Sequence, residues 1–417
     1  MTTLIFGRGG LGWTHKLAAW RLGTAGVVLT AGALLLGPVS TGYAVDTFQT
    51  LYGTVLGIAG SGGLVKITVD VTNPSANSGA ALFTTLSGVS GVNPDSLVLN
   101  NSTSPTTIYF TDLNAGKVTS YSLVTNTIGS SVTIGTGAGT QPQDMTVEQG
   151  GNTLLVSGFA GQVYRVNLTS FTTSTVGPTL TASGPEGVVN VTNGGNGAGT
   201  ISPTNYFVNG GTTSGVGTRG VASLSAGSFG VKDILEYSQS GTLVATFNNG
   251  GAHFNSLDAM VYQASTGLIW ATSHYGVPGT GVPEIYSLDP SNNTVHTYLL
   301  TQGGIITPLA TDGVGNGWEA LDGITVANGF LYIVEQNVGS LSGTSPTYSN
   351  DSADRIDVFN TTTDTWVGST NAIAALDDLA PVESTVITAG VPEPVSAGLS
   401  LLGLGGLGLA ALRRRRA

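Results

Sequence analysis

Short alternating runs of apolar and polar residues dominate the middle of the chain, and they predict β-strands. Between residues 45 and 390 no apolar pattern with a helical period of 3.6 residues is sustained. The runs are instead rich in Val, Ile, Thr and Tyr, and turns rich in Gly, Asn, Ser and Thr separate them. Period-two alternation between such turns is typical of half-buried strands. We therefore expect an all-β fold.

The predicted strands recur as a unit. One strand type has Pro or Leu, then an acid or its amide, then a small residue (once Asp), then alternating apolar residues. A second strand follows in four of the five copies, and third and fourth strands follow these. Intervals of 48, 43, 72 and 64 residues between the acidic positions, with four strands in each, are typical of β-propeller blades. The two long intervals contain Gly-rich insertions, at 193–230 and around 276–281. The five copies begin at Pro94, Pro142, Pro185, Leu257 and Leu321.

A C-terminal strand is expected to close the ring of blades. Three strands precede the first complete repeat, but none of them is of the first type. The segment Glu383–Ile387 matches Asp95–Leu99 in its pattern, so it is predicted to complete the N-terminal blade and give six blades. Such a clasp removes an exposed strand edge. Five or seven blades also fit the spacing, and a β-solenoid is the alternative fold, although solenoid coils are much shorter than these repeats.

The first 44 residues are predicted to be a signal peptide, which signal peptidase removes. Basic residues precede an apolar run from Ala25 to Val39. This run is short for the hydrocarbon core of about 30 Å. Small residues at Gly42 and Ala44 then offer a cleavage site. The alternative is an uncleaved N-terminal anchor.

Residues 391–417 have the order of a sorting signal. Eighteen uncharged residues would make a helix of about 27 Å, enough to cross a bilayer, and a basic cluster after it favours a cytoplasmic end. The tail resembles the PEP-CTERM sorting signal. The resemblance implies a Gram-negative bacterium that makes extracellular polysaccharide, recognition by an exosortase, and cleavage near Pro-Glu-Pro. The alternative is an ordinary tail anchor. The tail contains Val391, Pro392, Glu393 and Pro394, the uncharged run from Val395 to Leu412, and Arg413, Arg414, Arg415 and Arg416.

Composition and charge exclude several classes of protein. A hydrophobic fraction of 40% is too high for a disordered chain. The chain has no Cys, so disulfides, thiolate metal sites and a cysteine nucleophile are excluded. Residues 45–390 hold 6 basic and 23 acidic residues, a net charge of −17, which argues against nucleic-acid binding.

The acidic position of the first strand type is a candidate metal site. If these strands are innermost, five carboxylates and one amide would face one mouth of a central channel. Such a ring of oxygen ligands suits Ca²⁺. Alternatively, each side chain satisfies backbone groups of the neighbouring blade. The ring would contain Asp95, Gln143, Glu186, Asp258, Asp322 and Glu383.

The segment Leu331–Asn337, with Asp322-Gly323-Ile324 before it, resembles the repeats of NHL and SMP-30-like propellers. The resemblance covers single blades and does not extend beyond the strand pattern. It implies a metal-dependent lactonase site in which Glu319, Asn255 and Asp322 hold a divalent metal. His253 or His274 would then act as the general base. The G-x-S-x-G, H-E-x-x-H, P-loop and EF-hand motifs are absent.

The sequence therefore favours an exported binding or structural protein with a β-propeller. It is expected to be an inner-membrane precursor first, and then to reach the cell surface or the extracellular biofilm matrix, where exopolysaccharide is its expected partner. The alternative is a secreted metal-dependent hydrolase or lactonase that works from the propeller mouth.

Overall fold

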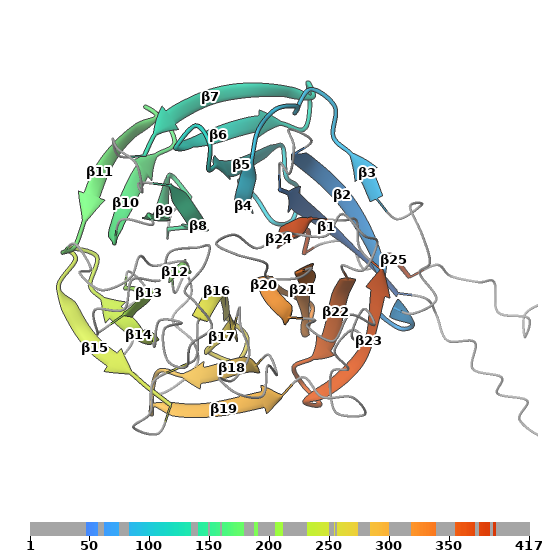
Figure 1. Cartoon of the computed structure of the whole chain (residues 1–417), viewed down its shortest axis with the longest axis vertical. Helices are drawn as coiled ribbons and strands as arrows, with labels where there is room; N and C mark the ends of the chain where they lie inside the picture. Colours follow the sequence, from blue (N-terminus) through green and yellow to red (C-terminus); the bar gives the residue numbers. More distant parts are fainter. Residues whose placement is uncertain are drawn as a thin grey trace, which may run out of the picture. The chain divides into compact units, whose positions relative to one another are not determined.

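The structure is a computed structural model, and it describes residues 47–56, 62–74, 83–134, 141–148, 151–158, 161–178, 187–190, 205–211, 232–249, 254, 257–273, 284–299, 318–338, 355–371, 375–383 and 387–388. These residues form 25 β-strands in six sheets, and the sheets are the blades of a β-propeller (Figure 1). The propeller lies within the unit Val45–Ala417. The prediction of an all-β propeller with six blades is confirmed, and the β-solenoid alternative is wrong.

The blades are numbered from the N-terminus. Blade 1 contains β1 (Thr47–Val55), β2 (Gly63–Asp70) and β3 (Phe83–Thr85), with β24 (Leu376–Pro381) and β25 (Ile387–Thr388) added to β1. Blade 2 contains β4 (Pro94–Leu99), β5 (Thr107–Asp112), β6 (Lys117–Ser122) and β7 (Thr127–Thr133). Blade 3 contains β8 (Pro142–Val147), β9 (Thr153–Gly158), β10 (Gln162–Asn167) and β11 (Thr172–Val176).

Blade 4 contains β12 (Val188–Asn190), β13 (Tyr206–Gly211), β14 (Lys232–Tyr237) and β15 (Leu243–Phe247). Blade 5 contains β16 (Leu257–Gln263), β17 (Leu268–Ser273), β18 (Glu284–Asp289) and β19 (Thr294–Leu299). Blade 6 contains β20 (Trp318–Ala327), β21 (Phe330–Val338), β22 (Arg355–Asn360) and β23 (Thr365–Asn371). In blades 2 to 6 each strand pairs with the next in sequence.

The first strand of blades 2 to 6 is innermost, which is the condition that the predicted acidic ring requires. In blade 1 the inner strand is β24, which comes from the far end of the chain. Each of these six strands contacts the inner strand of the next blade, so together they surround the centre of the ring (Figure 1).

The closing strand differs from the predicted one. The segment Glu383–Ile387 was expected to be innermost, but β24 takes that place, and Ile387 belongs to the short β25 that pairs with β1. Burial gives the reason, because Leu376 and Leu379 of β24 are 0% and 3% exposed whereas Glu383 is exposed. The prediction of a C-terminal clasp is confirmed, and its assignment to Glu383–Ile387 is wrong.

In blade 4 the expectation that residues 193–230 are an insertion is wrong in part. The sequence suggests that 193–230 is an insertion, but β13 lies inside it and pairs with both β12 and β14. Its residues Tyr206, Phe207 and Val208 are each no more than 1% exposed. The strand β13 is therefore the second strand of blade 4, which the repeat pattern does not reveal.

The hydrophobic core is divided among the contacts between blades. Each of six apolar clusters joins side chains of two neighbouring blades, and together the clusters include every pair of neighbours around the ring. Between blades 5 and 6, for example, the rings of Trp270 and Phe359 meet edge to face with centroids 5.9 Å apart. Every blade therefore buries apolar side chains against two others.

The inner strands also share a backbone irregularity. In blades 1, 2, 3, 5 and 6 the pairing of the inner strand with the next strand shifts by one residue at the second and third positions of the repeat. This is a β-bulge, which bends the strand and redirects its side chains. The bulge coincides with the acid and the small residue of the repeat.

Threonine side chains in the second strand of one blade donate hydrogen bonds to the bulge of the next blade. Thr54 donates from Oγ1 to the carbonyl oxygen of Asp95 at 2.7 Å, across blades 1 and 2. Thr272 donates to the carbonyl oxygen of Asp322 at 2.8 Å, across blades 5 and 6. These bonds satisfy backbone groups that the bulge removes from the ladder.

Candidate functional site

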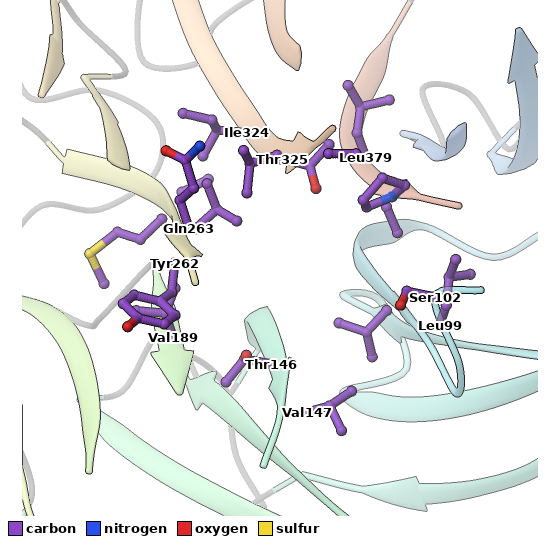
Figure 2. Close-up of a pocket in the computed structure, with 18 of the residues that line it drawn as sticks. Leu99, Ser102, Thr146, Val147, Val189, Tyr262, Gln263, Ile324, Thr325 and Leu379 are labelled. Atoms are coloured by element: carbon purple, nitrogen blue, oxygen red, sulfur yellow. The ribbon is translucent and has the colours of Figure 1, made fainter. Parts of the chain in front are cut away.

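A central cavity of about 700 Å³ is the candidate functional site. The inner strands of all six blades line it, so it occupies the middle of the propeller (Figure 2). It extends from the third position of the inner strands to the loops that follow these strands. Its lining residues include Asp144, Thr146, Val189, Tyr262, Thr325, Asp378 and Leu379.

One end of the cavity, which we call its inner end, lies at the third position of the inner strands. It holds two buried carboxyl groups from different blades. Ser96 Oγ of β4 lies 3.0 Å from Asp144 Oδ1 of β8 and 2.8 Å from Asp378 Oδ2 of β24. Burial raises the pKa of Asp144 well above its usual range, and the nearby Asp378 raises it further. Burial also raises the pKa of Asp378, to about 7. The pair thus retains a proton at pH values where exposed acids are ionised.

Backbone amides complete the environment of this pair. Val188 N donates to Asp144 Oδ2 at 2.9 Å, and Leu97 N donates to Asp378 Oδ2 at 3.2 Å. These bonds come from blades 4 and 2, so the inner end of the cavity is connected across four blades. Such donors lower the pKa of each acid and offset part of the effect of burial.

The walls combine apolar side chains with hydroxyl groups. Thr146 and Thr325 contribute hydroxyls from two blades, and Tyr262, Val189 and Leu379 contribute aromatic and apolar surface (Figure 2). Each inner strand has a single neighbour in its sheet, so its free edge adds backbone donors and acceptors. The cavity can therefore offer many weak polar contacts around an apolar surface.

The other end of the cavity lies at the loops after the inner strands. Ser265 and Asn328 are exposed there, as is Glu383, whose Oε2 accepts a hydrogen bond from Ser102 Oγ at 2.9 Å. Because these lining residues are exposed, this end is open to solvent.

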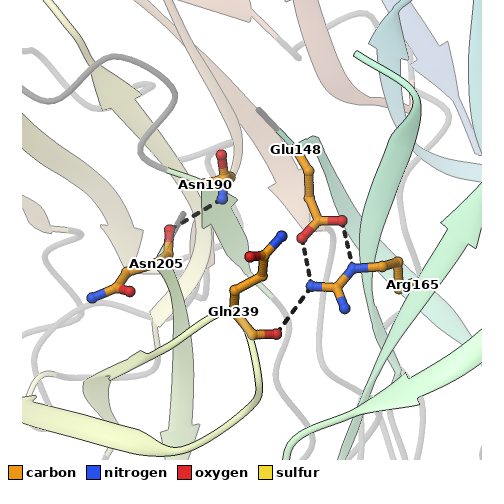
Figure 3. Close-up of polar contacts among 5 residues, drawn as sticks. All are labelled: Glu148, Arg165, Asn190, Asn205 and Gln239. Atoms are coloured by element: carbon orange, nitrogen blue, oxygen red, sulfur yellow. Dashed lines mark hydrogen bonds and ion pairs between the residues drawn. The ribbon is translucent and has the colours of Figure 1, made fainter. Parts of the chain in front are cut away.

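A polar cluster supports the cavity wall between blades 3 and 4 (Figure 3). Arg165 donates from Nε and Nη2 to the two carboxylate oxygens of Glu148, both at 2.6 Å, and from Nη2 to the carbonyl oxygen of Gln239 at 3.3 Å. Asn190, which lines the cavity, donates to the carbonyl oxygen of Asn205 at 3.1 Å. A two-pronged Arg–carboxylate contact fixes both partners in position.

A second buried ionic cluster lies in blade 6, away from the cavity lining. Arg355 Nε lies 2.6 Å from Glu335 Oε2 and 3.6 Å from Asp357 Oδ1, and both acids are 0% exposed. Burial and the neighbouring Glu335 raise the pKa of Asp357 well above its usual range, although Arg355 opposes this. One cation among two buried acids accounts for the retained proton, so this cluster is explained by its own contacts.

The predicted acidic ring is only partly described. Asp95, Asp258 and Asp322 occupy equivalent positions at the bulges and are at most 9% exposed, and Gln143 is 2% exposed. Within the described ranges no group of three or more His, Asp and Glu side chains is placed to hold a metal ion.

The remaining members of the predicted metal sites are not described. Glu186, Asn255, His253 and His274 lie outside the described residues, and the side chain of Glu319 is not described. Calcium binding and the lactonase-like site therefore stay predictions.

Sequence reasoning missed the two acids that do meet. The third position of the repeat was interpreted as a place for small residues, with Asp144 as an exception, and Asp378 lies in a strand that was not recognised. The run Leu376-Asp377-Asp378-Leu379 repeats the form of the inner strands and was the available signal.

The C-terminal tail lies outside the described residues. In the part of the chain that the structure describes, no helix has the length and apolarity needed to span a membrane.

Comparison with known proteins supports the fold alone. No protein-family model matches the sequence, and neither does any curated protein. The chain is similar to a chain in the crystal structure of a nidogen/laminin complex, with a TM-score of 0.50 and 10% sequence identity. The similarity covers 81% of this chain and 99% of that one. At this identity the match shows that both are β-propellers and carries no statement about ligands.

Proposed function

We propose that this chain is an exported bacterial protein whose propeller acts as a binding module for exopolysaccharide in a surface or biofilm matrix. The observation that carries the proposal is the solvent-open cavity that the inner strands of all six blades line. Central openings between repeated elements are common ligand sites, because several elements can each contribute one contact.

The chemistry of the cavity supports a hydroxyl-rich ligand. Its hydroxyls, backbone groups and amide side chains both donate and accept hydrogen bonds, as the hydroxyls of a saccharide require. The net charge of −17 in residues 45–390 keeps the protein soluble and disfavours nonspecific contacts in a hydrated matrix.

The tail supports the sorting part of the proposal. Pro392, Glu393 and Pro394 precede an uncharged run and four arginines, an order that fits recognition by an exosortase at the inner membrane. The precursor would be held there after signal peptidase acts, and it would reach the cell surface or the extracellular space after cleavage.

Binding is tested with exopolysaccharide from the producing cells and the purified chain, by co-sedimentation and calorimetry. Thr146→Phe fills the cavity wall and is expected to weaken binding at least about tenfold. Thr173→Phe, on the exposed strand β11 of the same blade, is the matched control and should bind like wild type. Equal binding by Thr146→Phe and wild type would contradict a role for the cavity.

Sorting is tested separately in the producing cells. Replacing Glu393 with Gln, or the four terminal arginines with Gln, should leave an unprocessed precursor in the inner membrane. Release of mature protein at the wild-type level would show that the tail is not a sorting signal, whatever the outcome of the binding experiment.

A further inference from the structure

The contact between Ser96, Asp144 and Asp378 requires a proton beyond the one that the serine carries. A hydroxyl has one hydrogen, so Ser96 can donate to only one of the two carboxyl groups. Its Oγ nevertheless lies 3.0 Å from Asp144 Oδ1 and 2.8 Å from Asp378 Oδ2. Both contacts are favourable only when one carboxyl group is protonated and donates to the serine oxygen.

The surrounding bonds are alike for the two acids, so the proton belongs to the pair. Asp144 Oδ1, which faces Ser96, also accepts from Met145 N at 2.6 Å, and Asp144 Oδ2 accepts from Val188 N. Asp378 Oδ2, which faces the serine, also accepts from Leu97 N, and Asp378 Oδ1 accepts from Leu379 N at 2.7 Å. The serine can therefore donate to either carboxylate while the other carries the shared proton.

No cation replaces this proton among the described residues. The groups that face the pair from β4 include the carboxyl group of Asp95, which raises the pKa of Asp378. The strand β12 contributes a backbone amide, and β20 contributes Gly323, where a Cβ atom would lie 2.6 Å from Asp378 Oδ1. The nearby positions of β20 and β24 carry two further acids, Asp322 and Asp377. Arg165 and Arg355, by contrast, pair with other acids.

The place of the pair in the fold gives the proton a consequence. Asp378 belongs to β24, the strand that closes the ring, and Asp144 belongs to blade 3, on the other side of blade 2. The contacts of Ser96 therefore connect β24 of blade 1 with blades 2 and 3. When both acids are ionised, one contact becomes repulsive and two charges remain in a buried site.

We propose that the proton shared by Asp144 and Asp378 through Ser96 locks β24 into the ring, and that losing it at alkaline pH loosens the closure of the propeller. The two acids and Ser96 lie at the inner end of the cavity, but their shared proton does not depend on a ligand there. It makes the closure of the ring sensitive to external pH.

The test compares the full-length chain with Asp144→Asn. The amide has nearly the shape of the protonated acid and cannot ionise, so one partner of Ser96 stays neutral at every pH. The native acid binds its proton more tightly than the unfolded one, so stability is greatest at low pH and falls as pH rises toward the native pKa. Relative to Asp144→Asn, the unfolding equilibrium constant of wild type should rise about tenfold per pH unit above about pH 5, and then level off. Asp364→Asn, in an exposed turn, should keep the wild-type dependence. The same pH dependence in wild type and Asp144→Asn would overturn the proposal.

A measurement on wild type alone covers the case in which Asp144→Asn does not fold. Amide hydrogen exchange, corrected for the intrinsic effect of pH, is measured at Val382, which follows β24 and donates to the carbonyl oxygen of Thr50 in β1, and at Ile67 in β2. Protection at Val382 should fall at least about tenfold between pH 6 and pH 9 while protection at Ile67 changes less. An equal change at both amides, or no change at Val382, would also overturn the proposal.

Discussion

Removing the closing strand should abolish the stable fold, and removing only the residues after it should not. The decisive comparison is between a chain that ends at Ala375, which lacks β24, and one that ends at Glu383, which lacks only β25. Leu376 and Leu379 are buried against blades 1 and 6, and Ala380 is buried against blades 1 and 2. Burying two leucines stabilises by about 5 kcal/mol.

Hydrogen bonding adds to this loss. The strand β24 pairs with Tyr52 and Gly53 of β1, and each such bond contributes about 1 kcal/mol. A total of about 7 kcal/mol is comparable to the whole stability of a typical domain, which is about 5 to 15 kcal/mol. The chain that ends at Ala375 should therefore aggregate or remain unfolded.

The chain that ends at Glu383 should lose about 1 kcal/mol, because β25 pairs only two residues with β1. Thermal unfolding followed by circular dichroism, with size-exclusion chromatography, distinguishes the two chains. If the chain that ends at Ala375 melts at the temperature of the longer one, the reasoning from burial is refuted.

Two smaller substitutions test the contacts between blades, and urea unfolding measures both. Gly323→Ala should cost at least about 2 kcal/mol, because its Cβ atom would lie 2.5 Å from the carbonyl oxygen of Asp377, whereas Gly368→Ala meets nothing closer than 3.4 Å and should cost less than about 1 kcal/mol. Thr272→Val leaves a buried carbonyl of blade 6 without its donor and should cost about 1 to 3 kcal/mol, whereas Thr173→Val on an exposed strand should cost almost nothing. Similar losses in either pair would contradict these roles.

The repeated blades could be predicted because their signals are local. Alternation within a strand and a turn after it fix strand pairs whose partners are a few residues apart. The inner strands β4, β8 and β16, and β20 from Leu321 onward, are predicted in this way. The strand β13 was missed because Gly-rich sequence on both sides concealed it.

A further local signal marks the outer hairpins. The last turn residue before the fourth strand has a positive φ in five blades and is followed by Thr each time. Asn, Gly and Asp account for four of these positions, as expected for residues that tolerate the left-handed region. These residues are Asn126, Phe171, Gly241, Asn293 and Asp364.

The closing strand and the cavity could not be predicted in the same way. Pairing between β24 and β1 joins residues more than 300 positions apart, and Glu383–Ile387 has an alternation just as suitable as that of Leu376–Pro381. The bulge adds another uncertainty, because one extra residue shifts the alternation and so changes which side chains meet across the axis. The meeting of Asp144 with Asp378 thus depends on ring closure as well as on sequence.

The pairing of β25 with β1 determines how the propeller responds to a pull on its ends. Thr388 lies opposite Thr47, so the first and last described residues are neighbours in one antiparallel pair. A load applied to the chain beyond Thr388 acts first on this two-residue pair and opens it one residue at a time. The two residues of β25 therefore separate from β1 before tension reaches β24, the strand that closes the ring.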